Sequence, residues 1–342
     1  MKKILVTGSE GYIGSVLVPL LLNKGYDVDG LDTSYYTHIL GDTPKHTYHL
    51  ITQDIRNIEG LDLSVYDAII HLAALSNDPI GELNDTLTEE INYQATCRLV
   101  QLAKDQGVKR FIFSSSCSIY GIGTEDEVNE SSQVNPLTAY AKSKILVENE
   151  LIKLSDDNFC VGIMRNSTVY GYSPKFRDDL VVNNLTACAF TTNKIKIMSD
   201  GSPWRPLIDI RDLSEIFAAF LEIDSDKINS EIFNIGFNEN NLQVKNIADV
   251  IQECLPGCTI EYTGEHGNDS RSYKVSFNKF SEMFPTITRN WSIKKSVEDL
   301  IFQFKNANFS QKQFIDHEYT RLTNLQELIN SAELNNDLFW TH

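Results

Sequence analysis

The stretch Lys3-Ile4-Leu5-Val6-Thr7-Gly8-Ser9-Glu10-Gly11-Tyr12-Ile13-Gly14 joins a short apolar strand to a turn with glycine at every third position. A helical pattern of apolar residues follows it (Val16, Leu17, Leu20, Leu21). Gly8 permits the tight turn, Gly11 lets backbone approach a pyrophosphate, and Gly14 lets the helix pack close to the strand. The free N–H groups and the dipole of the helix then face the phosphates. The candidate dinucleotide-binding residues here are Gly8, Gly11, Tyr12, Ile13 and Gly14.

The next predicted strand, residues 28–31, is followed by a carboxylate, Asp32, eighteen residues after Gly14. A carboxylate at this place can accept hydrogen bonds from both hydroxyls of a ribose, and it repels a 2′-phosphate. Residues 33–36 include no basic side chain that could hold such a phosphate. The pattern favours NAD over NADP, and the alternative for Asp32 is an aspartate that caps a helix or a turn.

Three further segments are typical of strands in a parallel sheet. Residues 51–55 carry a polar and an apolar side chain where an adenine can lie, and residues 67–74 run from a buried strand into small residues. His71 lies within that strand, so we interpret it as a core histidine. Residues 110–116 end in hydroxyls, which also suit a loop, and ligands bind beyond the carboxyl ends of such strands. The candidates are Asp54, Ile55, Leu72, Ala73, Ala74, Ser114, Ser116 and Ser118.

Tyr140 and Lys144 lie in the run Thr138-Ala139-Tyr140-Ala141-Lys142-Ser143-Lys144, which opens a helical stretch. Residues four apart share one helix face, so the lysine ammonium can stabilise a phenolate. A phenol ordinarily has a pKa of about 10, and lowering it to roughly 7 takes ~4 kcal/mol of differential stabilisation. That requires more than one nearby positive charge. The alternative for the pair is a solvated helix face.

The composition excludes several classes of protein. The 342 residues are 42% hydrophobic and 23% charged, with a net charge of −17, so the basic stripe of a nucleic-acid binder is missing. The six cysteines form no C-x-x-C pair and no zinc-like cluster, so reduced thiols in the cytoplasm and no metal are expected. We expect neither a signal peptide nor a membrane span, because the chain starts with a strand and contains no long apolar run.

The ordered set of these motifs resembles the extended short-chain dehydrogenase/reductase family, which comprises sugar-nucleotide epimerases and dehydratases. The resemblance implies that Tyr140 is the acid/base at a sugar hydroxyl and that Lys144 holds the nicotinamide ribose of NAD. It implies that Ser116 hydrogen-bonds the same sugar oxygen. Arg205 would pair with the pyrophosphate of a nucleoside-diphosphate sugar, and Asn184 would lie near its nucleotide.

The resemblance continues past the helix, with informative departures. Residues 165–171 resemble the R-x-x-N-x-x-G segment of the family, residues 200–212 its G-x-x-x-R-D segment, and residues 233–236 its [YF]-N-[IL]-G segment. The 4,6-dehydratases of the family carry an Asp-Glu pair where this chain has Cys117 and Ser118. Thr168 replaces the asparagine that grips the substrate, and Pro206-Leu207 replaces an aromatic/aspartate pair. The elimination chemistry of the dehydratases is therefore not expected.

One branch of the family is closer than the others. Residues 170–184 and 269–275 resemble bacterial enzymes of surface-polysaccharide pathways, a branch that includes epimerases and an enzyme that oxidises C4 of a GDP-heptose. Arg177 and Arg271 lie in these segments and are candidates for contact with phosphate or sugar. The alternative for each is a structural ion pair.

The resemblance implies an α/β fold, with a Rossmann-type doubly wound parallel sheet and a smaller C-terminal substrate-binding lobe. We expect the NAD-binding domain at 1–171, with 205–235 returning to it, and the substrate lobe at 172–204 and 236–342. The leucine spacing of 319–329 predicts a C-terminal helix packed on the body, and an exposed tail that joins a partner is the alternative. Family members are commonly homodimers built through two helices, here 87–106 and 139–155.

These expectations converge on NAD-dependent hydride chemistry at C4 of a nucleoside-diphosphate sugar. The leading hypothesis is a 4-epimerase of surface-polysaccharide sugar biosynthesis. The alternatives are a net C4 dehydrogenase or 4-ketoreductase, for instance of a GDP-heptose, and less favourably a 4,6-dehydratase. The hypothesis from a different class is a non-catalytic regulator that binds a dinucleotide. The sequence leaves open the nucleotide base and the sugar.

Overall fold

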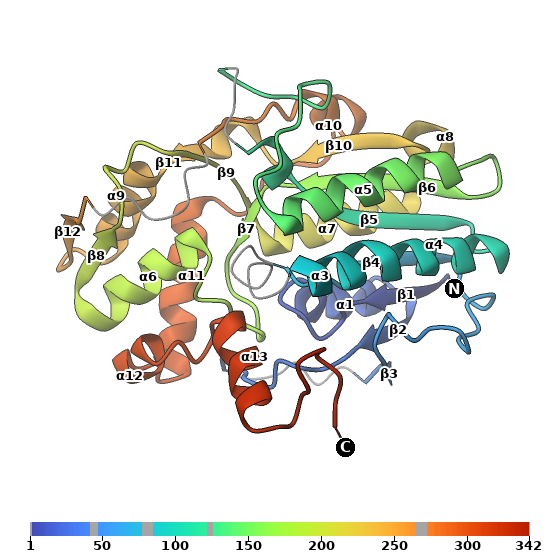
Figure 1. Ribbon diagram of the computed structural model, residues 1–342. Helices are drawn as coiled ribbons and strands as arrows, with labels where there is room; N and C mark the ends of the chain where they lie inside the picture. The colour runs from blue at the N-terminus through green and yellow to red at the C-terminus, as the bar shows by residue number, and fades with distance from the viewer. Residues whose placement is uncertain (1, 42–46, 77–84, 122–125, 265–271, 342) are drawn as a thin grey trace.

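A seven-stranded sheet with all strands parallel forms the larger part of the molecule (Figure 1). The computed structural model describes residues 2–41, 47–76, 85–121, 126–264 and 272–341. The order of the strands reverses between β1 and β4, and in such sheets ligands bind beyond the carboxyl ends at that point. In spatial order the strands are β10 (Glu231–Ile235), β6 (Cys160–Asn166), β5 (Arg110–Ser116), β4 (Ala68–His71), β1 (Lys3–Thr7), β2 (Asp27–Asp32) and β3 (His49–Thr52).

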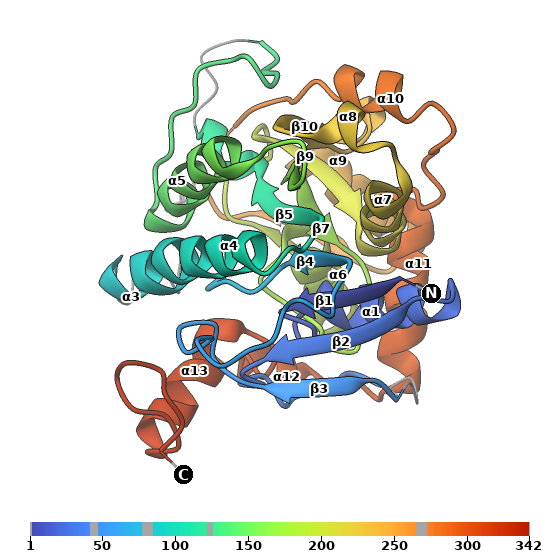
Figure 2. The same ribbon diagram turned by 90° about the vertical axis from the view of Figure 1, so that its right-hand side faces the viewer.

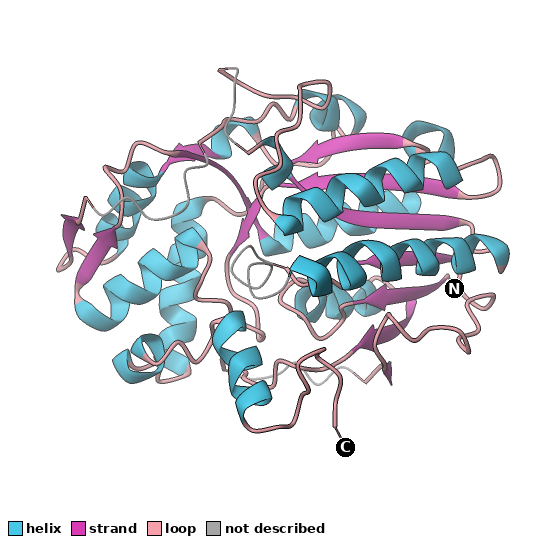
Figure 3. Cartoon of the chain, viewed as in Figure 1, coloured by secondary structure: helices cyan, strands magenta, loops and turns pink. Residues whose placement is uncertain are grey.

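Helices cover both faces of this sheet, as Figures 2 and 3 show. Strand β1 explains why both faces are buried: Ile4 and Val6 pack with α1 and α7, while Leu5 belongs to the core under α4 and α5. A run of apolar residues without polar alternation therefore fits a parallel strand. The helices of the two faces are α1 (Gly14–Asn23) and α7 (Ile210–Glu222) on one side, and α3 (Asp85–Glu89), the π-helical turn η1 (Glu90–Ala95), α4 (Thr96–Asp105) and α5 (Ala139–Leu154) on the other.

A smaller part lies beside the carboxyl ends of the sheet. Two small sheets build it, β7 (Thr168–Tyr170), β9 (Trp204–Asp209) and β11 (Asn241–Gln243) in one, β8 (Lys194–Ile197) and β12 (Thr259–Tyr262) in the other. Its core forms where α6 (Val181–Thr192), α9 (Val244–Cys254) and α11 (Ile293–Asn306) pack on each other. The chain then returns to the large sheet, because α7 follows β9 and β10 pairs with β6.

The remaining elements connect or cap these layers. They include the predicted C-terminal helix, which packs on the body of the protein: Leu325 is fully buried in the core of the large sheet. The elements are the 3-10 turns η2 (Cys117–Tyr120) and η3 (Asn238–Asn240) and the helices α8 (Ser225–Ile228), α10 (Asn278–Met283), α12 (Gln311–Ile315) and α13 (Arg321–Asn330).

Two sequence predictions can be compared with the structure at single residues. His71 is a core histidine, since Thr7 and Thr96 hydroxyls lie 2.7 and 2.9 Å from its ring nitrogens and burial lowers its pKa to about 3. The strand predicted at 51–55 is instead β3 at His49–Thr52. It ends early because the Asp54 carboxylate accepts a hydrogen bond from the Arg56 backbone N–H at 2.7 Å, which forms a local turn.

Candidate active site

A cleft of about 750 Å³ opens beyond the carboxyl ends of the central strands, between the large sheet and the smaller part. It brings together residues from widely separated parts of the sequence. Cys117 is not among the lining residues, and Arg271 lies outside the described residues. The predicted residues that line the cleft are Gly8, Gly11, Tyr12, Ile13, Gly14, Asp32, Asp54, Ile55, Leu72, Ala73, Ala74, Ser114, Ser116, Ser118, Tyr140, Lys144, Thr168, Arg177, Asn184 and Arg205.

The glycine turn leaves no space for side chains at two positions. Gly8 has a φ of +74°, and a Cβ there would lie 2.8 Å from the backbone nitrogen of Ala73. A Cβ on Gly14 would lie 2.2 Å from the carbonyl oxygen of Gly8. The turn thus brings bare backbone and the N-terminus of α1 to the cleft, which is the cradle that a pyrophosphate requires. The residues present fit a dinucleotide.

Asp32 ends β2 with its carboxylate at the cleft. Its oxygens accept hydrogen bonds from the backbone N–H groups of Ser34 at 2.8 Å and Glu10 at 3.0 Å. Burial raises the pKa of Asp32, and the two backbone donors oppose that shift. Each carboxylate oxygen has a further lone pair, so Asp32 can still accept from ribose hydroxyls.

The Asp54 carboxylate, which borders the cleft as a candidate, is paired with a neighbouring arginine. Arg56 donates to both of its oxygens, with Nε 3.0 Å and Nη2 2.8 Å away. The Tyr35 hydroxyl lies 3.4 Å from it as well. The carboxylate is therefore held by the protein itself, and Asp54 and Ile55 border the cleft beside this ion pair.

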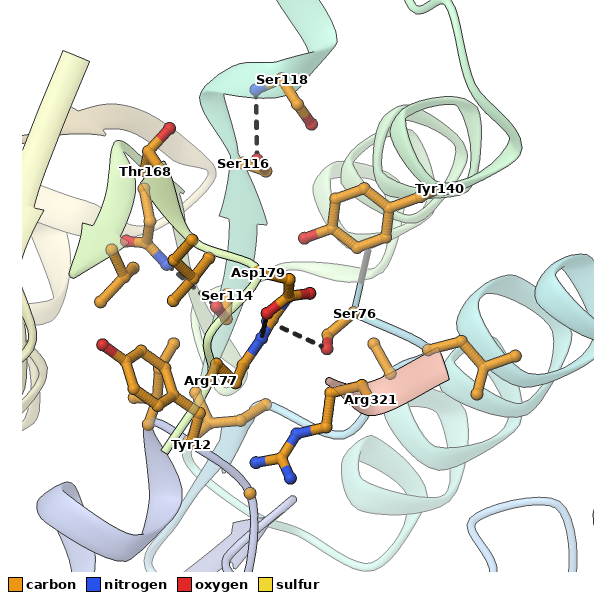
Figure 4. A pocket seen from close by; sticks show the side chains of 18 of the residues that line it. Tyr12, Ser76, Ser114, Ser116, Ser118, Tyr140, Thr168, Arg177, Asp179 and Arg321 are labelled. Carbon is orange, nitrogen blue, oxygen red and sulfur yellow. Dashed lines mark hydrogen bonds and ion pairs between the residues drawn. The ribbon is translucent and has the colours of Figure 1, made fainter. Parts of the chain in front are cut away.

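Tyr140 and Lys144 begin helix α5, which Thr138 caps by accepting from the backbone N–H of Ala141 at 3.2 Å. The Lys144 ammonium is buried, donates to the Ser114 carbonyl at 2.8 Å and lies 5.4 Å from the centre of the Tyr140 ring. Burial lowers the pKa of Lys144 to about 7, although Glu148 one turn further along the helix raises it. Figure 4 shows the Tyr140 side chain directed from α5 into the cleft.

A buried ion pair holds α5 against the sheet beneath Tyr140 and Lys144. Glu148 accepts from Arg165 of β6, with Nη2 2.7 Å away, and from the Ser115 hydroxyl at 2.5 Å. Arg165 also donates to the Tyr120 hydroxyl at 3.0 Å. Such a pair is costly to break from one side, because the remaining charge stays buried. The network therefore fixes the position of the helix that carries Lys144.

The end of β5 presents hydroxyls but no carboxylate to the cleft. The Ser116 hydroxyl accepts from the Ser118 backbone N–H at 3.1 Å, as Figure 4 shows. The Ser118 hydroxyl is buried at the cleft without a hydrogen-bond partner among the described residues. Cys117 points away, since its thiol donates to the Arg165 carbonyl at 3.1 Å and burial raises its pKa.

The smaller part contributes the opposite wall. Arg177 is buried and pairs with Asp179 through two hydrogen bonds of 2.9 and 2.8 Å, and it also donates to the Ser76 hydroxyl at 3.3 Å (Figure 4). Asn184 donates from its amide to the Asp178 carbonyl at 2.8 Å. Arg205, in β9, also lines the cleft, although it is far from the glycine turn in the sequence.

Sequence reasoning missed several lining residues. The most distant is Arg321, the first residue of α13, which enters the cleft from the C-terminal segment. Its helix was predicted from the leucine spacing, but spacing alone does not show where the first side chain points. The other described residues in this group include Tyr36, Ser76, Asp179, Lys196, Val244 and Tyr273.

Two negative findings hold for the described part of the chain. Its His, Cys, Asp and Glu side chains form no group that could hold a metal ion. None of its helices has the length and apolar character needed to cross a membrane.

Curated relatives match most of the chain. A UDP-glucuronic acid decarboxylase 1 of Arabidopsis thaliana is 27% identical, over 91% of this chain and 72% of its own length. A UDP-glucuronate 4-epimerase of Thermodesulfobacterium geofontis is 26% identical, over 86% of this chain and 92% of its own.

Among solved structures, a UDP-glucuronic acid 4-epimerase of Bacillus cereus in complex with UDP-glucuronic acid and NAD is 25% identical. It superposes with a TM-score of 0.74 over 89% of this chain and 99% of its own. Residues 4–236, more than half of the chain, match one family along the whole region that carries the glycine turn, Asp32 and the Tyr140–Lys144 pair. The chain therefore belongs to the NAD dependent epimerase/dehydratase family.

Proposed function

We propose that this protein is a 4-epimerase of a nucleoside-diphosphate sugar, with Tyr140 as its acid/base. The observation that carries the proposal is one end of the cleft: Tyr140, Lys144, Ser116 and Ser118 all line it, while the Cys117 thiol donates to the Arg165 carbonyl. A hydroxyl-lined site with one acid/base suits oxidation and reduction at a carbinol. Elimination needs a further acid and base at the positions that Cys117 and Ser118 occupy.

The protein side chains have distinct parts in this reaction. NAD, when bound, supplies the acceptance and return of a hydride. Tyr140 takes the proton of the C4 hydroxyl and gives it back, and the buried Lys144 ammonium, 5.4 Å from its ring centre, favours the phenolate. Ser116 holds the sugar oxygen by a hydrogen bond. The 4-keto sugar must turn over in the cleft before reduction, so the wall around C4 has to tolerate both faces of the ring.

The carboxylates of the described cleft are already engaged, which also disfavours acid–base elimination. They are Asp32, Asp54 and Asp179. Asp32 accepts from two backbone N–H groups, and the other two pair with Arg56 and Arg177. A carboxylate held by a permanently charged guanidinium is a poor proton shuttle.

The substrate contacts of the proposal come from the smaller part. Arg205 would pair with the substrate pyrophosphate, Asn184 would lie at the nucleotide, and Thr168 and Ser118 would contact the sugar. The named relatives act on UDP-glucuronate, and here the base and sugar are matters for experiment. The resemblance of residues 170–184 to the surface-polysaccharide branch supports a product used in that biosynthesis and keeps a GDP-heptose among the substrates to be tested.

The proposal includes a cytoplasmic homodimer. All six cysteines are free thiols, as a reducing compartment requires. The dimer would form through α4 and α5, where Leu146 and Ile152 of α5 are 42% and 39% exposed. Division into an NAD-binding domain at 1–171 and 205–235 and a substrate lobe at 172–204 and 236–342 remains part of the proposal.

The experiment is a screen in two steps. A thermal-shift series of UDP-, GDP-, CDP- and dTDP-sugars with NAD identifies the base, because a ligand that binds only the folded state raises its stability. The best ligand is then incubated with the protein in deuterated water without added NAD. A 4-epimerase yields the C4 epimer with unchanged mass and no carbon-bound deuterium.

Other outcomes contradict the proposal in distinguishable ways. Loss of water with deuterium incorporation identifies a dehydratase, loss of CO2 a decarboxylase, and stoichiometric NADH a net dehydrogenase. Tyr140→Phe should lower turnover by about 10²- to 10⁴-fold, the usual contribution of a general acid/base. Tyr262→Phe is the matched control, because that ring is 51% exposed. Unchanged turnover in Tyr140→Phe would show that Tyr140 is not the acid/base, whereas no turnover of any sugar nucleotide by the wild type would favour a dinucleotide-binding regulator.

A further inference from the structure

The C-terminal segment, residues 318–341, lies against the part of the cleft that follows Asp32. The Trp340 ring N–H donates to the Thr33 carbonyl at 2.8 Å, and the Tyr35 hydroxyl donates to the Leu338 carbonyl. Thr33 and Tyr35 both line the cleft. Figure 2 shows α13 and the C-terminus beside β2 and β3. The end of the chain is thus docked next to the dinucleotide side of the site.

Arg56 holds this segment in place. Its side chain is only 1% exposed and lies 3.6 Å from the centre of the Phe339 ring, while it donates to the Asp337 carbonyl at 2.8 Å. The same guanidinium pairs with Asp54, which borders the cleft. Stacking, ion pairing and donation at once require a planar, permanently charged group. Arg56 therefore joins the C-terminal segment to the rim of the cofactor cleft.

The docked segment delivers Arg321 into the cleft. This side chain is 2% exposed, donates to the Lys175 carbonyl at 2.9 Å and lies 4.0 Å from the centre of the Tyr36 ring. Figure 4 shows its guanidinium on the side of the cleft where Tyr12 of the glycine turn lies. The guanidinium has five N–H donors, so contacts with one carbonyl and one ring leave donors for a ligand in the cleft that Arg321 lines.

Arg321 is a buried cation without a carboxylate within 4.0 Å among the described residues. Two other buried cations lie nearby and have their own contacts. Arg177 forms an ion pair with Asp179, and the ammonium of Lys175 donates to the Tyr36 carbonyl at 2.7 Å. Burial, the largest effect, lowers the pKa of Arg321 to about 10, and Tyr36, Asp179 and Asp32 oppose the shift in that order. A buried cation of this kind is costly unless an anion meets it.

We propose that Arg321 is a cofactor-binding residue that pairs with the pyrophosphate of NAD, opposite the glycine turn. The pyrophosphate is the anionic part of the dinucleotide, and a guanidinium suits a bidentate contact with it. The C-terminal segment, fixed by Arg56, is then a structural part of the NAD site. Docking of this segment and binding of NAD are coupled, so that NAD is enclosed once bound.

This inference rests on the NAD dependence of the family and not on the proposed reaction. Enclosure fits an epimerase, because the cofactor need not leave between turnovers. The two proposals can nevertheless fail separately, since one concerns affinity and the other turnover.

The test measures binding to cofactor-free protein by calorimetry with NAD, ADP-ribose and adenosine. In Arg321→Ala we expect the Kd of NAD and of ADP-ribose to rise about 10- to 100-fold, as for loss of a hydrogen bond between charged groups. The Kd of adenosine, which lacks phosphates, should change less than about twofold. In Arg321→Lys the Kd of NAD should lie between the wild-type value and that of Arg321→Ala. Arg56→Ala should raise the Kd of NAD about tenfold, and the double variant of Arg56→Ala and Arg321→Ala should bind NAD no more weakly than Arg321→Ala alone.

Lys312→Ala is the matched control, because this residue of α12, just before the C-terminal segment, is 85% exposed at its side chain and pairs with Asp316. Its Kd values should equal those of the wild type. The cofactor-free Arg321→Ala protein should unfold at the wild-type temperature or above it, since an unpaired buried charge has been removed. A lower unfolding temperature with an unchanged Kd of NAD would show a structural role only. An equal loss for adenosine and ADP-ribose would place Arg321 at the ribose. Either result overturns the proposal.

Discussion

Lys144 combines the proposed catalytic role with an unfavourable location for a charge. It is 4% exposed, and its ammonium has one hydrogen bond, to the Ser114 carbonyl. Burial lowers its pKa to about 7, with Glu148 acting in the opposite direction. The folded protein therefore binds fewer protons at this site than the unfolded chain does between pH ~7 and ~10.5. Stability must rise with pH over that interval, and the full cost of the charge is present below pH ~7.

Replacing Lys144 with methionine should therefore increase stability while it abolishes turnover. We expect the free energy of unfolding of the cofactor-free Lys144→Met protein at pH 6 to exceed the wild-type value by about 3 kcal/mol. The gain should shrink as pH rises from 7 towards 10.5, because the wild-type lysine loses its proton in the folded state. Urea denaturation at pH 6 and pH 9 measures both values.

The matched control is Lys142→Met, two residues earlier on an exposed position of the same helix. It should change stability by less than about 0.5 kcal/mol at either pH. A gain in Lys144→Met that does not depend on pH would mean that the lysine binds its proton equally in the folded and unfolded states, so that burial does not lower its pKa.

Single residues differ in how far the sequence could predict their places. His71 was correctly interpreted, since a histidine inside an apolar strand has little choice but the core. The position of Cys117 could not be read from its neighbours, because the 3-10 turn η2 begins there and rotates the thiol towards Arg165. The position of Arg321 could not be predicted for a different reason. Its entry into the cleft depends on how the last 20 or so residues dock, which no local pattern encodes.

At the scale of elements, the glycine turn was the most predictable part of the chain. Its conformation is dictated by sterics, and the clash distances explain each choice of residue. A Cβ at Gly14 would meet the carbonyl oxygens of Gly8 and Ser9 at 2.2 and 2.6 Å. Both are backbone atoms of the same turn, so they cannot move aside without changing the cradle.

Gly14→Ala should consequently impair both stability and cofactor binding. We expect a loss of about 2 kcal/mol in the free energy of unfolding, the usual cost of overpacking, and a rise of about tenfold or more in the Kd of NAD. Chemical denaturation and calorimetry provide the two values. Gly60→Ala is the control, because a Cβ there meets nothing within 4 Å. It should be neutral or slightly stabilising. Wild-type NAD affinity in Gly14→Ala would disprove the assigned role of the turn.

The edge of the sheet was less predictable than its centre. Strands β1, β4 and β5 each contain a run of buried apolar residues. Strand β3 lies at the edge beside β2, and its residues are exposed or half-buried. Its end is set by a side-chain hydrogen bond of Asp54, and the same carboxylate holds Arg56 for the C-terminal segment. The early end of β3 thus leaves the Asp54 carboxylate available to pair with Arg56.

At the scale of the whole molecule, the cleft is built from three regions that lie far apart in sequence. The first region is the sheet with its glycine turn, the second is the segment around Arg177, and the third is the C-terminal segment with Arg321. The first carries family motifs and was predicted in detail. The second was a candidate through the resemblance of residues 170–184, while the place of Arg321 in the cleft follows from the folded structure only.

The exposed face of helix α5 bears on how two copies of the chain could assemble. Leu146 of α5 is 42% exposed and Ile152, on the same helix, is 39% exposed. An interface between two copies would cover exposed apolar side chains such as these. The same helix carries Tyr140 and Lys144. If the homodimer forms through α4 and α5, a charge at the centre of this surface must be buried on association or prevent it.

Leu146→Glu should therefore weaken the dimer by about 2 kcal/mol or more, a rise of roughly 30-fold in its dissociation constant. Light scattering after gel filtration over a range of concentrations measures this constant. Phe302→Glu is the matched control: Phe302 is 58% exposed on α11, away from α4 and α5, and its replacement should leave the assembly unchanged. The reverse result, dissociation by Phe302→Glu alone, would move the interface to the smaller part. A wild-type protein that is monomeric at all concentrations would show that these apolar side chains serve no contact between copies, and that each cleft works alone.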